Sequence, residues 1–285
     1  MASGTKHPLR DTITIGGDLT VRRIGFGAMR ITGPGVWGPP ADRPAAVALV
    51  RHAVDAGVNF IDTADSYGPY VSEEIIAEAL APYADNVVIA TKAGFVRPGP
   101  DEWVIDARPK RLRECAEGSL RRLKRDCIDL FQLHRIDPRV PMEESLGALT
   151  DLQREGKIRH IGISQTSVDA YEQAKKTATI VSVQNRYNVE DRGSEDVLKA
   201  CERDGVVFLP WFPLGGTGSL KHAALQRMAA ALRATPTQVA LAWLLARSQY
   251  ILPIPGTSSI THFDENLKAV ELSLTTAQFE ELSST

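Results

Sequence analysis

The chain alternates short apolar runs, rich in β-branched residues, with longer amphipathic stretches over most of its length. The runs are bounded by polar or turn residues, as buried parallel strands are. The longer stretches carry apolar residues at helical spacing. Strict strand–helix alternation predicts a parallel sheet covered by helices. The expected strands are Ile24–Ala28, Val58–Ile61, Val87–Thr91, Ile128–Leu133, Ile158–Ile163, Ile180–Val183, Val206–Leu209 and Ile251–Ile254. The expected helices are Arg43–Gly57, a segment starting at Ser72, Pro109–Arg125, Pro141–Glu155, Ser167–Lys176, Ser194–Asp204 and Pro236–Arg247.

Eight such strands in 285 residues predict an α/β fold of the closed (β/α)8 TIM-barrel type. Barrels of this kind need about 250 residues, so we expect a single domain, residues 1–285. The rival is an open doubly wound sheet, which favours a G-x-G-x-x-G turn after its first strand. Gly25-Phe26-Gly27 begins that pattern, but Arg30 stands at the third glycine position. Thr12–Ile15 and Leu19–Arg22 flank a Gly-Gly-Asp turn and predict an N-terminal β-hairpin across the bottom of the barrel.

Composition excludes several classes of function. The net charge of −2 gives no reason to expect nucleic acid or an anionic membrane as a partner. The longest apolar stretch, Val239–Ala246, is far short of the roughly 20 residues that span a bilayer. The first ten residues have no apolar core of a signal peptide, which argues against secretion. Three widely spaced cysteines without a C-x-x-C pair predict reduced thiols in a cytoplasmic protein. The six histidines form no H-x-x-x-H pair, so no metal site is expected.

Polar and aromatic groups follow the carboxyl ends of the expected strands, where parallel barrels perform chemistry. Asp62, Tyr67, Lys92 and His134 converge there after three successive strands. A free phenol has a pKa near 10, and an adjacent ammonium favours the phenolate and lowers that pKa. An aspartate paired with the lysine keeps the ammonium charged and in place. A histidine nearby can hydrogen-bond the same substrate oxygen. This set suits general acid catalysis at a carbonyl oxygen while hydride reaches the carbon.

Each of these residues also has a structural interpretation. Asp62 could cap a turn, Tyr67 could be a packed rim aromatic, and His134 could be a satisfied core histidine. Lys92 is the least ambiguous, because a lysine at the end of an apolar strand is partly buried and needs partners. Together, at the ends of successive strands, the four residues favour catalysis.

Four segments resemble the aldo-keto reductase superfamily. They are Phe60–Gly68, Ile89–Lys92, Leu130–His134 and Gly156–Ser164, in the family's order. The resemblance implies a (β/α)8 barrel that binds NADPH extended across its mouth without a Rossmann domain. It also implies that Tyr67 is the general acid, that Lys92 and Asp62 tune it, and that His134 orients the carbonyl.

The resemblance also assigns residues to the cofactor. Ser164, Gln165 and Gln184 would hold the nicotinamide carboxamide, although many relatives have Asn where this chain has Gln165. Trp211 takes the place of an aromatic, usually tyrosine, that stacks on the nicotinamide; alternatively it is a packed rim residue. The remaining residues implied in cofactor binding are Phe212, Pro213, Leu214, Gly215, Ile254, Gly256, Thr257, Ser258, His262, Glu265 and Asn266.

Position 262 leaves the choice between NADPH and NADH open. The resemblance places Thr257, Ser258 and His262 near the 2′-phosphate of the cofactor, where many relatives use Arg in place of this histidine. Arg gives a permanent bidentate contact, whereas His gives a weaker contact that depends on pH. We expect NADPH, with NADH as an alternative. Ser258 could instead serve only to form a turn. The resemblance places Asn266 at the adenine, but this residue could also be a solvated helix residue.

A closer similarity is to the bacterial pyridoxal reductases within this superfamily. It rests on Gly27-Ala28-Met29, the loop Gly33–Pro40, Tyr67-Gly68-Pro69 and Phe212–Gly216. The loop would lie over the substrate, or be only a rigid turn. Candidate substrate contacts, which could also be solvated, are Trp37, Phe95, Arg97, Trp103 and Arg135.

Two functions from different classes follow from the resemblance. The first is an NADPH-dependent oxidoreductase that reduces an aldehyde or ketone to an alcohol, with pyridoxal as the leading named substrate. The second is an NADPH-binding sensor or regulatory barrel with little turnover. Isomerase or aldolase chemistry has no support beyond the barrel, since fold alone does not fix function. We expect a small-molecule carbonyl as partner and a monomer or weak homo-oligomer.

Overall fold

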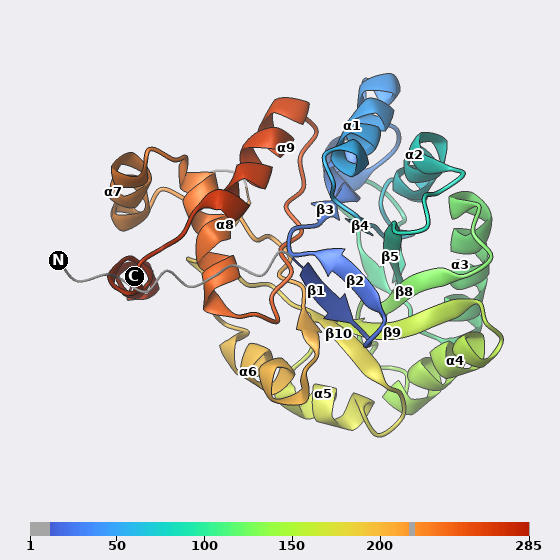
Figure 1. The fold of residues 1–285 in the computed structure, drawn as a ribbon. Coiled ribbons are helices and arrows are strands. Elements are labelled where there is room, and N and C mark those ends of the chain that lie inside the picture. Colours follow the sequence, from blue (N-terminus) through green and yellow to red (C-terminus); the bar gives the residue numbers. More distant parts are fainter. Residues whose placement is uncertain (1–11, 217–219, 285) are drawn as a thin grey trace.

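A parallel sheet curls into a barrel at the centre of the computed structural model, which describes residues 12–216 and 220–284 (Figure 1). Seven strands lie in the order β11-β10-β9-β8-β5-β4-β3, and each neighbouring pair is parallel. Five of the expected strands are thus confirmed in place, and two, at the ends of this order, are shortened to two residues each. The strands are β3 (Phe26–Gly27), β4 (Phe60–Asp62), β5 (Val88–Ala93), β8 (Ile128–Leu133), β9 (Ile158–Ser164), β10 (Ile180–Gln184) and β11 (Val207–Phe208).

The eighth position of the barrel is filled by the segment 250–255, which is not a regular strand. Ile251 forms an isolated parallel bridge with Phe208, and Leu252 N donates to Phe208 O at 3.0 Å. On the other side, the Gly25 and Gly27 amides donate to the carbonyls of Pro253 and Pro255 at 2.9 and 3.2 Å. The two prolines cannot donate in return, so no complete ladder forms. The expected strand Ile251–Ile254 is therefore wrong as regular structure, although the segment closes the (β/α)8 barrel.

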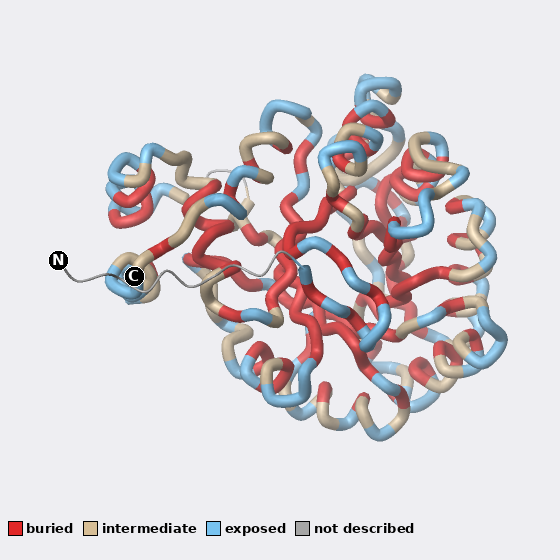
Figure 2. Tube along the Cα trace, viewed as in Figure 1, coloured by how far each residue is buried: buried red, intermediate tan, exposed pale blue. Residues whose placement is uncertain are grey.

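Helices surround the strands, and buried residues concentrate on the strands and on the helix faces that meet them (Figures 1 and 2). The expected helices are present within a few residues of their predicted bounds. Local signals explain several ends: Asp42 caps the first helix, and Thr235 with Gln238 forms a capping box. The helices are α1 (Arg43–Asp55), α2 (Val71–Leu80), α3 (Pro109–Leu123), α4 (Met142–Arg154), α5 (Val168–Ala174), α6 (Glu195–Asp204) and α8 (Pro236–Arg247). Elements that the sequence did not predict are α7 (Ala223–Leu232), α9 (Ile260–Leu267), α10 (Thr276–Ser283) and the short hairpin β6 (Phe95–Val96) with β7 (Val104–Ile105).

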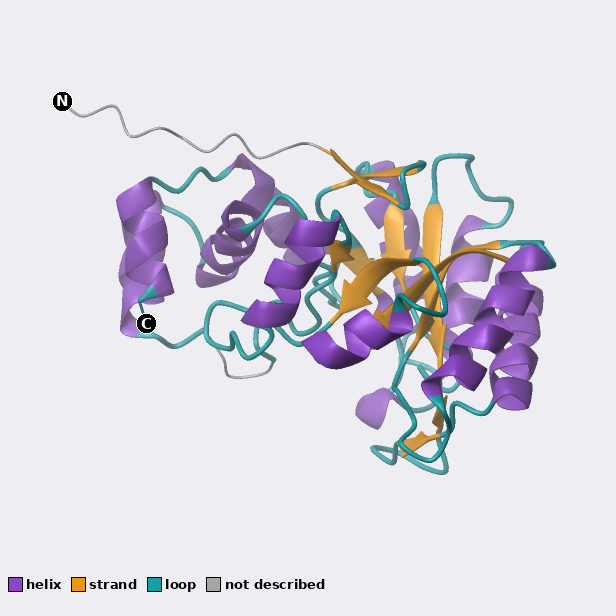
Figure 3. Ribbon diagram, turned by 90° about the horizontal axis from the view of Figure 1, so that it is seen from below, coloured by secondary structure: helices purple, strands orange, loops and turns teal. Residues whose placement is uncertain are grey.

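The predicted N-terminal hairpin, β1 (Thr12–Ile15) with β2 (Leu19–Arg22), closes one end of the barrel (Figure 3). Ile15 and Val21 are fully buried and pack with residues of the barrel interior such as Leu130. Asp18 in the turn accepts hydrogen bonds from Arg159 and His160 of β9. This end is filled with side chains, which leaves the opposite end, where the strands finish, for a ligand.

No helix in the described ranges is long and apolar enough to cross a membrane. The three cysteines are free thiols, two buried and one partly buried.

Candidate active site

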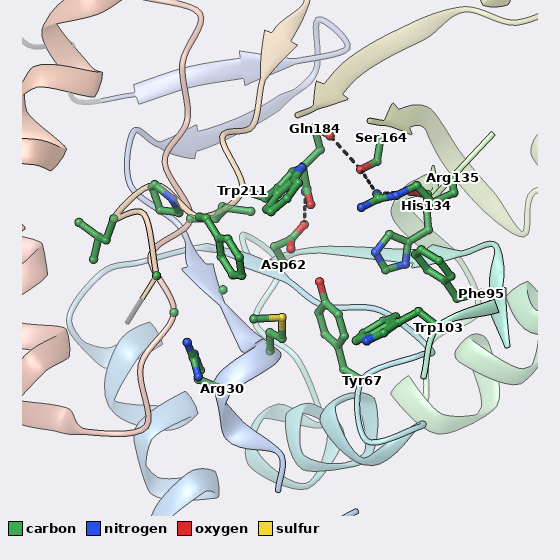
Figure 4. Close-up of a pocket in the computed structure, with 18 residues that line it drawn as sticks. Arg30, Asp62, Tyr67, Phe95, Trp103, His134, Arg135, Ser164, Gln184 and Trp211 are labelled. Carbon is green, nitrogen blue, oxygen red and sulfur yellow. Dashed lines mark hydrogen bonds between the residues drawn. The ribbon is translucent and has the colours of Figure 1, made fainter. Parts of the chain in front are cut away.

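A cavity of about 370 Å³ opens where the barrel strands end (Figure 4). Its walls come from the ends of most of the barrel strands and from the loops that follow them. The residues that line it are Gly27, Met29, Arg30, Asp62, Tyr67, Phe95, Trp103, His134, Arg135, Ser164, Gln184, Trp211, Phe212, Pro213, Leu214, Gly216, Ile254 and Gly256.

A fully buried ion pair lies at the bottom of the cavity. Lys92 Nζ, from β5, donates to Asp62 Oδ1 at the end of β4 and to the carbonyl of Thr63, both at 2.7 Å. The lysine is 0% exposed and the aspartate 3%. The amides of Gln184 and Gln132 donate to the second oxygen, Asp62 Oδ2, at 2.8 and 3.3 Å. Burial lowers the pKa of Lys92, but Asp62 and Tyr67 outweigh it and raise the pKa overall, so the ammonium stays charged. The pair is therefore fixed before any ligand binds.

The Tyr67 phenol stands above this pair, with Lys92 Nζ 5.2 Å from the centre of its ring. Its side chain is almost fully buried, with its hydroxyl directed into the cavity (Figure 4). Burial raises the pKa of Tyr67, Lys92 opposes that shift, and the net direction is upward. The expectation that the lysine lowers the pKa of the phenol is thus wrong in its net direction, because desolvation is the larger effect. A phenol in this setting keeps its proton at neutral pH and can donate it.

His134, just after β8, faces the same cavity as a neutral imidazole. Burial lowers its pKa well below the ordinary value, and Lys92 and Arg135 lower it further. Its Nδ1 lies 3.4 Å from Ser66 Oγ. If the serine hydroxyl donates to Nδ1, the ring proton is on Nε2, which can then donate to a substrate oxygen. Ser66 lies in the loop after β4, and the sequence assigned it no role in orienting the histidine.

Aromatic rings close the side of the cavity next to His134. Phe95 and Trp103, from the β6–β7 hairpin, meet the imidazole edge-on at centroid distances of 4.8 and 6.4 Å. Trp103 also lies 6.5 Å from the Tyr67 ring. A flat substrate ring would therefore meet aromatic surface beside the reacting groups.

A hydrogen bond joins the side chains of Trp211 and Gln165. At both positions this chain differs from the residue usual in the family it resembles. The indole Nε1 donates to Gln165 Oε1 at 3.0 Å. The backbone of Gln165 is left-handed, with φ of 54°, and its side chain is exposed. The glutamine thus reaches over the mouth to the indole and does not line the cavity, whereas Trp211 does. The amide that the sequence assigned to the nicotinamide has a protein partner in this structure.

The structure brings together most, but not all, of the residues that the sequence singled out. Lys92 is buried below the cavity lining, where it bonds to Asp62. Gly215 does not line the cavity, although its neighbours Leu214 and Gly216 do. The residues assigned to the adenosine phosphate stand beyond Gly256, on the loop into α9 and on that helix: Thr257, Ser258, His262, Glu265 and Asn266. Ser258 and His262 are exposed, whereas Thr257 and Asn266 are buried. Cavity residues that the sequence did not assign are Gly27, Met29, Arg30 and Gly216.

Arg97 was expected to touch substrate or solvent, and the structure contradicts both. It is buried, and its guanidinium donates to backbone carbonyls of three loops, including Val36 at 3.0 Å, Ser66 at 2.9 Å and Glu102 at 2.7 Å. It lies 3.7 Å from the centre of the Trp103 ring and 5.7 Å from that of Trp37. Trp37 accordingly packs on this arginine and does not line the cavity. Arg97 therefore ties the loop Gly33–Pro40 to the β6–β7 hairpin.

Comparison with known proteins places the chain in a family. Residues 23–285 match the model of the aldo/keto reductase family. Pyridoxine 4-dehydrogenase of Escherichia coli is 44% identical, with 93% of this chain and 94% of that protein covered. An uncharacterized oxidoreductase of Schizosaccharomyces pombe is 45% identical, with 93% of this chain and 87% of that protein covered.

Solved structures agree with this assignment. Glycerol dehydrogenase from Gluconobacter oxydans has a TM-score of 0.87 at 28% identity, covering 96% of this chain and 94% of that one. An aldo/keto reductase from Klebsiella pneumoniae, in complex with NADP and acetate, has a TM-score of 0.82 at 29% identity, covering 96% and 95%. The chain belongs to the aldo/keto reductase family. It is an oxidoreductase built on a (β/α)8 barrel.

Proposed function

We propose that this protein is an NADPH-dependent reductase that converts an aldehyde or ketone into an alcohol, with Tyr67 as the general acid. The observation that carries the proposal is the Tyr67 phenol in the cavity, next to the buried Lys92–Asp62 pair. The phenol keeps its proton until it is needed, and the ammonium stabilises the phenolate once the proton has left.

The cavity suits an extended nicotinamide nucleotide. Trp211 offers an aromatic face in the wall, with Ser164 and Gln184 close by as partners for a carboxamide (Figure 4). At the other end, Gly27 and Gly256 line the cavity near the cationic Arg30, and their lack of side chains lets the two backbone segments lie close together. Solved relatives crystallised with NADP or NADPH support the choice of cofactor. We assign Ser258 and His262 to its 2′-phosphate, with NADH as the alternative cofactor.

The chemistry then follows from the positions of four side chains. When bound, NADPH supplies the hydride that the carbonyl carbon receives. Tyr67 donates its phenolic proton to the carbonyl oxygen, which becomes the alcohol hydroxyl, and the phenolate recovers a proton from solvent. His134 holds the carbonyl oxygen toward the phenol by a hydrogen bond. Lys92 balances the phenolate charge, and Asp62 keeps the ammonium in place.

Pyridoxal is our leading named substrate. A relative that is 44% identical is a pyridoxine 4-dehydrogenase, whose name describes the reverse reaction on the same ring system. The aromatic side chains Phe95 and Trp103 beside His134 suit a planar ring. Family membership and the enzymes among the relatives favour catalysis over a sensor barrel.

Three further properties belong to this proposal. The chain forms one domain over residues 1–285, in line with a family match over residues 23–285. It acts in the cytoplasm, where its three free thiols would stay reduced. It is a monomer or weak homo-oligomer that acts on a small molecule.

The test is NADPH oxidation, followed by nicotinamide absorbance, with pyridoxal and a nitrobenzaldehyde as substrates and NADH as the alternative cofactor. We expect turnover of both aldehydes, with a lower KM for pyridoxal. If only the activated nitrobenzaldehyde is reduced, pyridoxal is rejected as the substrate, but the assignment as a reductase stands. Tight NADPH binding without any turnover would contradict the proposal and favour the sensor.

A further inference from the structure

Arg135 places a cation in the cavity wall directly beside the proposed catalytic residues. It follows His134 at the end of β8, and its guanidinium reaches into the cavity between Ser164 and His134 (Figure 4). Nη1 donates to the carbonyl of His134 at 2.8 Å and to Ser164 Oγ at 3.3 Å. The group also lies 5.3 Å from the centre of the Phe95 ring and 5.9 Å from that of Trp211. It is thus held in place while two of its nitrogens, Nε and Nη2, face no acceptor among the described residues.

The charge of Arg135 is not balanced by the described part of the protein. No carboxylate there lies within the 4.0 Å of an ion pair, and both acceptors on Nη1 are neutral oxygens. Asp62 also lines the cavity, but it is engaged with Lys92. Burial lowers the pKa of Arg135, which is the direction expected for a cation that has lost water without gaining a counterion. A half-buried guanidinium in this state gains most from a ligand that brings a negative oxygen.

The position of the cation defines where that oxygen would be. Tyr67, His134 and Arg135 line the same cavity, and Arg135 directly follows His134 in the chain. A carbonyl held by Tyr67 and His134 therefore has Arg135 on its flank. Arg30, the other arginine in the wall, lies at the far end of the cavity in Figure 4.

We propose that Arg135 binds an ionised oxygen that the substrate carries beside its reacting carbonyl. The site then prefers aromatic aldehydes with an acidic hydroxyl next to the aldehyde over aldehydes that lack it. This inference rests on the proposed function, because it names the substrate class of the same site. Pyridoxal belongs to that class, since its ring carries an acidic hydroxyl beside the aldehyde.

A matched pair of substrates isolates this contact. 3-Hydroxypyridine-4-carbaldehyde and pyridine-4-carbaldehyde differ only in the hydroxyl, and kcat/KM for each is measured with saturating NADPH. Wild-type protein should prefer the hydroxy aldehyde. Arg135→Met should lower kcat/KM for it by about 10- to 100-fold, the range expected for a charged hydrogen bond. The parent aldehyde should change by no more than a few-fold.

Three controls keep the outcome interpretable. The Kd of NADPH, measured by fluorescence quenching, should change by less than about twofold in Arg135→Met, which also shows that the variant is folded. Arg135→Lys should restore part of the preference, because it keeps the charge but not the fork of donors. Arg30→Met removes the same charge from the other end of the cavity and should leave the preference intact.

Several results would overturn the inference. If Arg135→Met lowers kcat/KM equally for both aldehydes, the arginine does not recognise the hydroxyl. A large rise in the NADPH Kd would assign it to the nicotinamide carboxamide, next to Ser164. If wild-type protein reduces both aldehydes without preference, the inference fails while the reductase stands. If it reduces neither, nor any other aldehyde, the proposed function itself fails.

Discussion

The floor of the cavity and its rim are held together in different ways. The floor comprises Asp62, Lys92, Gln132 and Gln184, and the rim comprises Arg30, Arg135, Gln165 and Trp211. The floor side chains are buried, and Lys92, Gln132 and Gln184 each donate a hydrogen bond to Asp62. The rim side chains are exposed or partly exposed and, as in Arg135, keep donors without a partner in the described chain. The floor is therefore arranged for chemistry before a ligand arrives, whereas the rim is completed by the ligand.

Breaking the floor should have the largest effect. Lys92→Met should lower kcat for reduction about 10³-fold, because the phenolate loses its counter-charge. The same change leaves Asp62 buried without its cation, which should cost about 3–5 kcal/mol of unfolding free energy. Activity assays and urea denaturation measure the two effects. The double variant Lys92→Met with Asp62→Asn should recover much of the stability and none of the activity. Recovery of activity in the double variant would contradict the role of the ammonium.

Loosening the loops above the floor should have an intermediate effect. Arg97→Met removes the hydrogen bonds to backbone carbonyls that hold the loop Gly33–Pro40 and the β6–β7 hairpin together. We expect KM for a bulky aromatic aldehyde to rise about tenfold, since Trp103 loses its support, with the NADPH Kd unchanged. Arg97→Lys should not rescue it, because one ammonium cannot satisfy several separated carbonyls. An unchanged KM in both variants would make Arg97 irrelevant to the substrate.

Breaking the Gln165–Trp211 contact of the rim should cost only a few-fold in NADPH affinity. Gln165→Leu frees the Trp211 indole from its hydrogen bond and should weaken NADPH binding by about three- to tenfold, as expected for a neutral hydrogen bond. Trp211→Phe removes the same bond while keeping an aromatic face. In a double-mutant cycle read out by the NADPH Kd, the two changes should be less than additive. Strict additivity would show that the pair does not act as a unit.

The last prediction is that kcat/KM for aldehyde reduction does not change with pH in the neutral range. The pKa of His134 lies well below its ordinary value of 6.5, so the imidazole is neutral throughout the neutral range. The Tyr67 phenol, whose pKa is raised, keeps its proton over the same range. The kcat/KM for aldehyde reduction should therefore stay flat between about pH 6 and 8. A rise on acidification through this range would indicate that an imidazolium, and not the phenol, donates the proton.

The sequence predicts Asp62, Lys92 and Gln184 of the floor because each lies at or near the end of an apolar strand, but it does not single out Gln132. Lys92 could be assigned a buried partner from its place on a strand alone, and the pair with Asp62 is present. The rim is harder to predict, because its contacts join loops that are distant in the chain. Gln165 and Trp211 were noted as separate departures, and only the fold brings them together. Arg30 entered the sequence argument only as a missing glycine, yet it lines the cavity.

The same contrast holds for the fold. Regular alternation locates the strands that pair on both sides, such as β8 and β9, almost to the residue. It fails at 250–255, where Pro253 and Pro255 allow the chain to accept hydrogen bonds but not to complete a ladder. The β6–β7 hairpin was missed because its two-residue strands carry too little periodicity to detect.

The most direct test of the account is the rate of hydride transfer in Tyr67→Phe, measured in a single turnover with NADPH and a nitrobenzaldehyde. The change removes the proton donor and leaves the ring, the Lys92–Asp62 pair and the cofactor wall in place. We predict a rate at least about 10³-fold below that of the wild-type protein, with the NADPH Kd within about twofold. A rate close to wild type, with the same NADPH affinity, would contradict the assignment of Tyr67 as the general acid.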